Sequence, residues 1–170
     1  MRKISRFRIY GLLFLAFIIH LTILGRVRIF GAEPDIMLSC VLFFGIFLGP
    51  RFGLETGIAA GLLKDIYSFD IFGANTLIFA ITGLLAGAVR TKFFKESKIT
   101  QALLVLIFSI FAMTAHFIVA LSVTRRLSVS MAEYIFSSVI PSSIYTSAVS
   151  VPIFLNFINL FGLKEDSEYL

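Results

Sequence analysis

Long runs without a charged residue make up most of this chain, and their lengths are typical of membrane-spanning helices. A span needs about 17 to 25 mostly apolar residues. Four runs reach this length, at residues 9–25, 71–89, 99–124 and 134–163. The run at 36–50 is marginal, and the run at 56–63 is too short by itself.

The positions of the basic residues decide whether the short run crosses the membrane. Lys and Arg cluster at residues 2–8 and again at residues 90–98, and the positive-inside rule places both clusters in the cytoplasm. Two segments on the same side are separated by an even number of crossings, but only three runs lie plainly between them. We therefore predict a fourth, short crossing at about residues 52–66, which would extend about 22 Å as a straight helix.

These patterns predict an all-α, polytopic integral membrane protein with six transmembrane helices and both termini in the cytoplasm. The last run is interpreted as one long helix that bends at Pro141 or Pro152, because proline removes a helical hydrogen bond. The connections are too short to hold a folded domain, so residues 1–170 form a single transmembrane domain. The expected spans are residues 9–25, 34–49, 52–66, 71–89, 99–123 and 133–161.

Composition agrees with a membrane protein and excludes several other classes. Hydrophobic residues make up 58% of the chain and the mean hydropathy is +0.97, values outside the soluble globular range. The net charge of +5 is explained by membrane topology, so nucleic-acid binding is not predicted. The single cysteine, Cys40, lies in the middle of a span and belongs to no disulfide or metal motif.

Glycine recurs at every fourth position from Gly45 to Gly61, and Pro50 divides this ladder between the second and third helices. A helical glycine costs about 0.8–1 kcal/mol relative to alanine, and in lipid close contact between helices offsets that cost. Small residues form similar stripes on three helices, at Gly53, Gly57 and Gly61, at Gly83 and Gly87, and at Ser138, Ser142 and Thr146. Two interpretations remain open, packing within the protein or a docking groove for another protein's transmembrane helix.

No catalytic constellation is present in the sequence. The chain lacks a nucleophile and base at recognisable spacing, a Walker-type loop, paired cysteine ligands and an H-E-x-x-H helix. We therefore predict no catalytic residue, no cofactor and no metal site.

A few polar residues are expected at membrane depth, and they are the remaining candidates for function. An intramembrane carboxylate needs a partner, so Asp65 either holds the fold through a hydrogen bond or contacts a partner protein. Lys64 is predicted to extend to the membrane surface, and Asp70 to cap the fourth helix. His20 and His116 share the expected depth of Asp65. Packed, hydrogen-bonded histidines are favoured over a metal or proton site, and ligand binding in this outer half stays open.

The residues around the second and third predicted helices resemble those of the MreD family of rod-shape-determining membrane proteins. The similarity consists of a Pro-Asp opening of the second helix, a Gly-Leu-Leu-x-Asp segment at the end of the third, and the glycines around it. These residues are Pro34, Asp35, Ile36, Met37, Leu38, Gly53, Gly57, Gly61, Leu62, Leu63, Lys64, Asp65, Gly73, Gly83 and Gly87. Recognisable motifs cover about residues 34–90, and the rest resembles the family only in hydropathy.

This resemblance implies a non-enzymatic, multi-pass subunit of the cell-elongation machinery in the bacterial cytoplasmic (inner) membrane. The implied direct partner is the transmembrane helix of the bitopic protein MreC, and the indirect partners are the actin-like MreB and the peptidoglycan polymerase RodA with its transpeptidase. The implied fold is similar to the six-helix S components of energy-coupling-factor vitamin transporters. The positions it marks as important are Pro34, Asp35, Gly57, Gly61, Asp65 and Gly73.

Two functions from different classes follow. In the first, the chain is a membrane scaffold that offers a flat small-residue face to MreC and supports peptidoglycan synthesis and cell shape. In the alternative, it is the substrate-binding S component of a vitamin transporter, which requires an outward-facing pocket with convergent polar groups. The chain has no tryptophan and its expected outer loops are short, so the scaffold is favoured.

Overall fold

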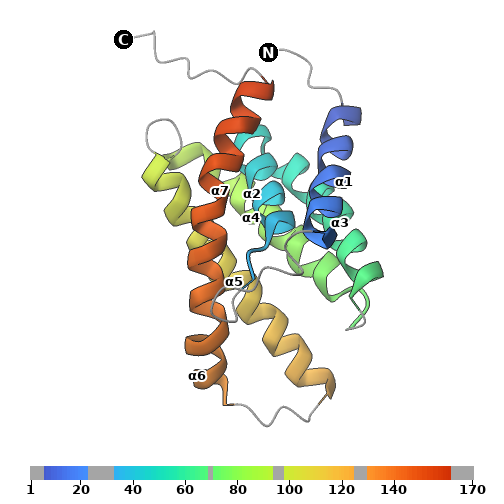
Figure 1. The fold of residues 1–170 in the computed structure, drawn as a ribbon, viewed down its shortest axis with the longest axis vertical. Coiled ribbons are helices and arrows are strands. Elements are labelled where there is room, and N and C mark those ends of the chain that lie inside the picture. Colours follow the sequence, from blue (N-terminus) through green and yellow to red (C-terminus); the bar gives the residue numbers. More distant parts are fainter. Residues whose placement is uncertain (1–5, 23–32, 69–70, 94–97, 125–129, 162–170) are drawn as a thin grey trace.

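The structure is a computed structural model that describes residues 6–22, 33–68, 71–93, 98–124 and 130–161. All regular secondary structure in these ranges is helical, as predicted (Figure 1). The elements are α1 (Arg6–Thr22), α2 (Ile36–Leu48), α3 (Pro50–Tyr67), α4 (Ala74–Phe93), α5 (Lys98–Thr124), α6 (Met131–Tyr134), the π-helical turn η2 (Ile135–Val139) and α7 (Ile140–Phe161). Each of the six expected ranges therefore contains a helical segment at nearly the same place.

Helix α2 is the centre of the bundle. Its residues from Met37 to Ile46 are all buried, and it packs against α1, α3, α4, α5 and α7. Aromatic rings join α2 to α7, with Phe43 contacting the rings of Phe154 and Phe157 at centroid distances of 5.2 and 5.1 Å. The apolar sequence of α2 thus builds the core and leaves the lipid-facing surface to the other helices.

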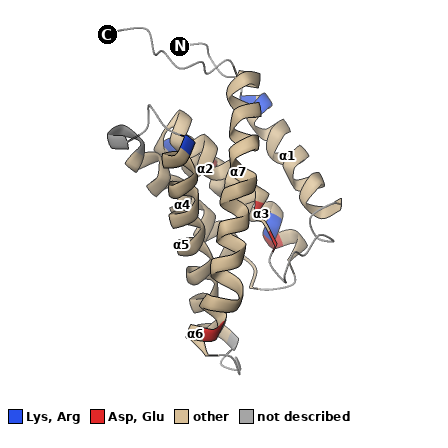
Figure 2. Cartoon of the chain, turned by 60° about the vertical axis from the view of Figure 1, so that its left-hand side comes forward, with Lys and Arg blue, Asp and Glu red and all other residues tan. Residues whose placement is uncertain are grey.

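The chain runs up and down through the bundle, so α1 begins and α7 ends at the same end (Figure 1). The basic residues of α1 lie at this end, and the acidic residue of α6 lies at the opposite end (Figure 2). This arrangement agrees with the alternation on which the six-span prediction depends. The side of the membrane that each end faces stays a prediction.

Gly49 makes the break between α2 and α3. Its φ of 105° lies in a region that residues with a Cβ rarely adopt, and Pro50 follows as the first residue of α3. The two halves of the glycine ladder therefore lie on separate helices. Gly73, with a φ of 93°, makes a second such turn immediately before α4.

Helices α6, η2 and α7 form one continuous helical segment, Met131–Phe161, that contains both prolines. The irregular turn lies immediately before Pro141, where the backbone N–H of Ile140 donates to the carbonyl of Ile135 in a π-helical bond. Because proline has no N–H to donate, the turn that precedes it loses α-helical bonds and widens. Pro152 lies inside α7.

The surface of the described bundle is strongly apolar. Two helices, Lys98–Val123 and Met131–Phe161, are long and apolar enough to cross a membrane by length and composition, and Ile36–Leu48 and Ala74–Val89 are shorter apolar helices. Large apolar side chains such as Ile66, Leu77 and Ile107 are exposed on α3, α4 and α5. An apolar exterior of this extent is typical of a surface that contacts lipid.

Candidate functional site

The glycine stripes of α3 and α4 pack directly against each other. A Cβ atom added at Gly53 would lie within 3 Å of backbone atoms of Gly83 and Gly45, and one at Gly57 would lie equally close to the backbone of Phe79. Gly61 and Gly87 contact the opposite ends of the same interface, against Thr76 and Pro50 respectively. The stripes thus let α2, α3 and α4 approach at backbone distance, and in this structure their faces lie inside the bundle.

The hydroxyl stripe on the last helix also faces the protein interior. Ser142 and Thr146 are buried, whereas Ser138 is partly buried and lies beside Ser137, with 3.4 Å between their Oγ atoms. Ser147, next to the stripe, donates to the carbonyl of Ala102 in α5 at 2.7 Å. Ser147 therefore connects α7 to α5, beside the buried part of the stripe.

Asp65 joins the end of α3 to the beginning of α4. Its buried carboxylate accepts hydrogen bonds from the backbone N–H and the side-chain amide of Asn75, both at 3.0 Å. It also accepts from the backbone N–H of Thr76 at 3.0 Å and from the Thr76 hydroxyl at 2.5 Å. A carboxylate satisfies the free N–H groups of a helix N-terminus and interacts favourably with the helix dipole. Asp65 thus caps α4 from the neighbouring helix, while Asp70, the predicted cap, lies outside the described residues.

Asp35 caps α2 and connects it to two other helices. Its Oδ1 accepts from the backbone N–H of Leu38 at 3.0 Å, and its own N–H donates to the hydroxyl of Thr146 in α7, also at 3.0 Å. Its Oδ2 forms an ion pair with the ammonium of Lys64 at the end of α3. One residue at the start of α2 therefore joins α2 and α3 through its carboxylate and α7 through its backbone N–H.

The prediction that Lys64 extends to the membrane surface is wrong. Its ammonium instead pairs with Asp35 and lies 5.0 Å from the ring centroid of Phe79. The side chain is only 26% exposed, and a nearby carboxylate and aromatic face stabilise its charge there. A second ion pair between helices joins Glu55 of α3 to Arg6 of α1 at 3.5 Å.

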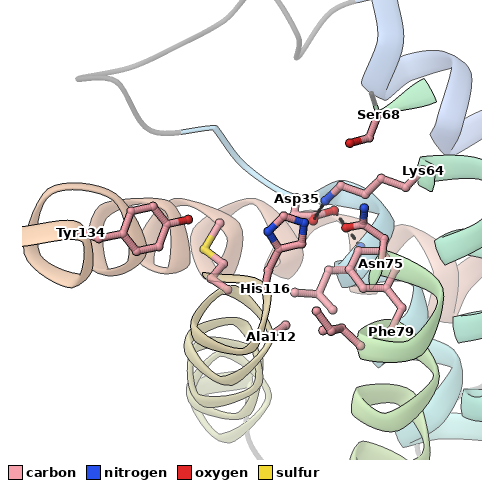
Figure 3. Close-up of a pocket in the computed structure, with 11 residues that line it drawn as sticks. Asp35, Lys64, Ser68, Asn75, Phe79, Ala112, His116 and Tyr134 are labelled. Atoms are coloured by element: carbon pink, nitrogen blue, oxygen red, sulfur yellow. Dashed lines mark hydrogen bonds and ion pairs between the residues drawn. The ribbon is translucent and has the colours of Figure 1, made fainter. Parts of the chain in front are cut away.

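The ion pair lies in a pocket of about 160 Å³ where the ends of α2, α3 and α4 meet α5 and α6 (Figure 3). Figure 3 shows the His116 ring beside Asp35, with Tyr134 farther along the pocket. Apolar side chains complete the wall. The pocket is lined by Asp35, Leu38, Lys64, Ser68, Asn75, Ile78, Phe79, Ala112, Met113, His116 and Tyr134. It therefore combines both signs of charge, neutral polar groups and apolar surface.

The structure does not bring Asp65, His20 and His116 together in one site, although the three were expected at one depth in the membrane. His116 lies with Asp35 in the pocket, whereas Asp65 is bonded to α4 and does not line it. His20 does not line the pocket, and its buried Nδ1 has no hydrogen-bond partner among the described residues. Within the described ranges no three His, Cys, Asp or Glu side chains are placed to hold a metal ion.

Several residues of this site carried no recognised signal in the sequence. Asn75 and Thr76 directly follow the Gly73 turn at the start of an apolar run, a position where free helix N–H groups need partners. Their proximity to Asp65 follows from the short α3–α4 connection. Tyr134 comes from a helix much farther along the chain, and no sequence spacing places it in the same pocket as Asp35.

Removal of the Thr146 hydroxyl tests the junction between α2 and α7. Thr146→Val keeps the side-chain volume but leaves the buried N–H of Asp35 without its acceptor, so we expect a loss of about 1–3 kcal/mol in stability. Thr22→Val is the matched control, because among the described residues the exposed Thr22 hydroxyl bonds to the carbonyl of Ile18 in its own helix. Thermal unfolding in detergent measures both variants, and equal unfolding temperatures would contradict the role of Thr146.

A known protein family matches nearly the whole chain. The sequence pattern of a family described as rod shape-determining protein MreD matches residues 1–163, and so extends well beyond the motifs at residues 34–90. No curated protein and no solved structure matches the chain. The matched region includes all the described helices, with the glycine stripes, the two aspartate caps and the pocket. The chain therefore belongs to the MreD family of rod shape-determining proteins.

Proposed function

We propose that this chain is a non-enzymatic scaffold subunit of the bacterial elongation complex, which binds MreC in the cytoplasmic membrane and so supports peptidoglycan synthesis. Membership of a bacterial membrane protein family that acts in rod shape determination supports this proposal. The family is a shape-determining one and not a known enzyme family. The MreB cytoskeleton and RodA with its transpeptidase are reached through MreC in this scheme.

Because the glycine stripes pack inside the bundle, we expect MreC to contact a surface other than the small-residue face predicted from the sequence. Gly53, Gly57 and Gly61 already touch the backbone of α4, so a partner helix would have to separate α3 from α4 to reach them. In the hydroxyl stripe, Ser142 and Thr146 are buried, and Thr146 accepts from the N–H of Asp35 immediately before α2. A flat small-residue face is therefore not free for docking, and we infer that the partner contacts a different surface.

The polar pocket is the observation that best supports a binding role. The pocket lies at the end of the bundle opposite the basic start of α1. The positive-inside rule assigns the basic end to the cytoplasm, and so assigns the pocket to the outer side. The chain of a partner that crosses the membrane once would pass the pocket where it leaves the outer side of the membrane. Its outer, membrane-proximal residues would find hydrogen-bond donors, acceptors and a charge pair in the pocket, while its transmembrane helix packs along the apolar exterior.

The size of the pocket favours a protein side chain over a vitamin. Small-molecule sites generally measure about 300–1,000 Å³, whereas this pocket measures about 160 Å³. One side chain or a short loop of a partner fits such a volume. The alternative function, an S component that encloses a whole vitamin, requires a larger cavity than the one between these helices.

Blocking the pocket tests the proposal. Ser68 lines the pocket at the end of α3, and its extended backbone accepts an aromatic residue without strain. We expect Ser68→Phe to fold, to reduce MreC co-purification by an order of magnitude or more, and to fail to restore rod shape in cells depleted of the protein. The reason is that the added ring occupies the space a partner side chain needs.

Ile66→Phe is the matched control, because Ile66 is 71% exposed on the same helix and does not line the pocket. It should retain MreC and restore rod shape. If Ser68→Phe retains MreC while substitutions on the exposed apolar ridges release it, the pocket assignment is wrong. If depletion leaves cells rod-shaped but stops uptake of a vitamin, the scaffold function itself is wrong.

A further inference from the structure

A second cavity, the α1–α7 groove, lies at the end of the bundle where the chain begins. It has a volume of about 360 Å³ and is lined by Phe7, Arg8, Gly11, Leu12 and Leu15 of α1 and by Leu160 and Phe161 of α7. The groove exists because α1 packs against α2 and α3 and makes no close backbone approach to α7. The two walls of the groove are therefore the facing surfaces of α1 and α7, two helices that do not pack closely against each other.

The groove is apolar along its length and basic at one position. Arg8 is the only charged residue that lines it, and among the described residues Arg8 has no ion-pair partner, whereas Arg6 pairs with Glu55. Gly11 faces open space, since a Cβ atom added there would meet nothing within 4 Å. A second basic residue, Arg6, lies two positions before Arg8 in the first turn of α1. An apolar groove with a guanidinium that has no ion-pair partner among the described residues matches the two halves of an anionic phospholipid.

We propose that the α1–α7 groove binds an anionic phospholipid, with an acyl chain between the helices and the phosphate at Arg8. A guanidinium forms strong, charge-assisted hydrogen bonds to phosphate, and basic segments beside the membrane attract anionic lipid. This site is independent of the MreC contact, because it lies at the other end of the bundle.

The dimensions of the groove favour a lipid chain over a partner's transmembrane helix. The wall that α1 contributes runs from Phe7 to Leu15, about 12 Å at 1.5 Å per residue. A helix that crosses the hydrocarbon layer packs over a length of about 30 Å. It would also leave Arg8 against an apolar surface without a counter-charge, which a phosphate supplies.

Lipid retention by the purified protein tests the proposal. The protein is exchanged into mixtures of phosphatidylglycerol and phosphatidylcholine with identical acyl chains, and bound lipid is counted by native mass spectrometry. We expect one phosphatidylglycerol to be retained, with at least a fivefold preference over phosphatidylcholine. Arg8→Gln should abolish the preference, and Gly11→Phe, which fills the groove, should abolish retention of either lipid.

Two substitutions outside the groove serve as controls. Arg51→Gln removes an exposed basic residue at the same end of the bundle, and Ala88→Phe adds a ring to an exposed position on α4, so both should retain phosphatidylglycerol as the wild type does. If Gly11→Phe does not fold, Arg8→Gln still tests the proposal, because it changes an exposed side chain. Equal retention of the two lipids by the wild type would overturn the proposal. So would unchanged retention by Gly11→Phe, or loss of MreC in place of lipid.

Discussion

Alanine at Gly53 is expected to destabilise the protein severely, whereas alanine at Gly11 is expected to leave it folded. The new Cβ at Gly53 would lie within 3 Å of backbone atoms in α2 and α4. Backbone atoms cannot rotate away, so the three helices must separate. Overpacking generally costs about 1–3 kcal/mol and sometimes more, and we expect the upper end or above. The measurement is reversible unfolding in mixed micelles with increasing dodecyl sulfate, followed by circular dichroism.

Gly11→Ala is the control that separates the effect of packing on stability from the effect of helix propensity. Alanine favours a helix by about 0.8–1 kcal/mol over glycine, and at Gly11 no neighbouring atom opposes this gain. Gly11→Ala should therefore be as stable as the wild type or slightly more stable, and Gly53→Ala much less stable. Equal stability of the two variants would show that α3 and α4 do not pack as described.

Much of the fold was predictable because lipid imposes simple rules on a sequence. The length of each apolar run predicts a helix, and the two basic clusters require an even number of segments between them. That parity argument predicted a helix where α3 lies, although the charge-free run at 56–63 is too short to indicate one by hydropathy alone. That α3 crosses the membrane stays a prediction. The break at Gly49 was predictable from Pro50 for a local reason, since proline begins a helix readily and cannot continue one.

Contacts between residues far apart in the chain were not predictable in the same way. Lys64 was expected to extend toward water because its sequence neighbours offer no partner, yet Asp35, 29 residues earlier, lies beside it. Glu55 lies one helical turn from Arg51 in the sequence, yet it pairs with Arg6 of another helix. Helical spacing identifies possible partners within one helix. The partner that forms depends on how the helices pack.

The two aspartates illustrate the same limit within the candidate site. Both were marked by the resemblance to the family, but their roles differ in the structure. Asp65 bonds to the first turn of α4, whereas Asp35 carries the ion pair that lines the pocket. Sequence position alone left open whether Asp65 holds the fold or faces a partner. The four hydrogen bonds from α4 indicate the first role.

We therefore expect Asp65→Ala to lower the stability of the protein, and to affect partner binding only through that loss. The substitution leaves two backbone N–H groups and the two side chains of Asn75 and Thr76 without their acceptor. Hydrogen bonds to a charged group contribute about 1.5–3 kcal/mol each, and unmatched buried donors add a further penalty. Even with partial compensation we expect a loss of at least about 3 kcal/mol, a large share of the 5–15 kcal/mol typical of a folded domain. Unfolding in mixed micelles measures this loss.

Two further variants separate the structural role of Asp65 from a partner contact. Asp65→Asn keeps the shape and one acceptor oxygen, so its stability should fall between those of the wild type and Asp65→Ala. Glu133→Ala removes an exposed carboxylate on α6 and should change stability by no more than about 0.5 kcal/mol. Hydrogen exchange at Asn75 and Thr76 should accelerate in Asp65→Ala, because their N–H groups lose the carboxylate. If Asp65→Ala instead unfolds like the wild type and still loses MreC, the carboxylate faces the partner and α4 is held by other contacts.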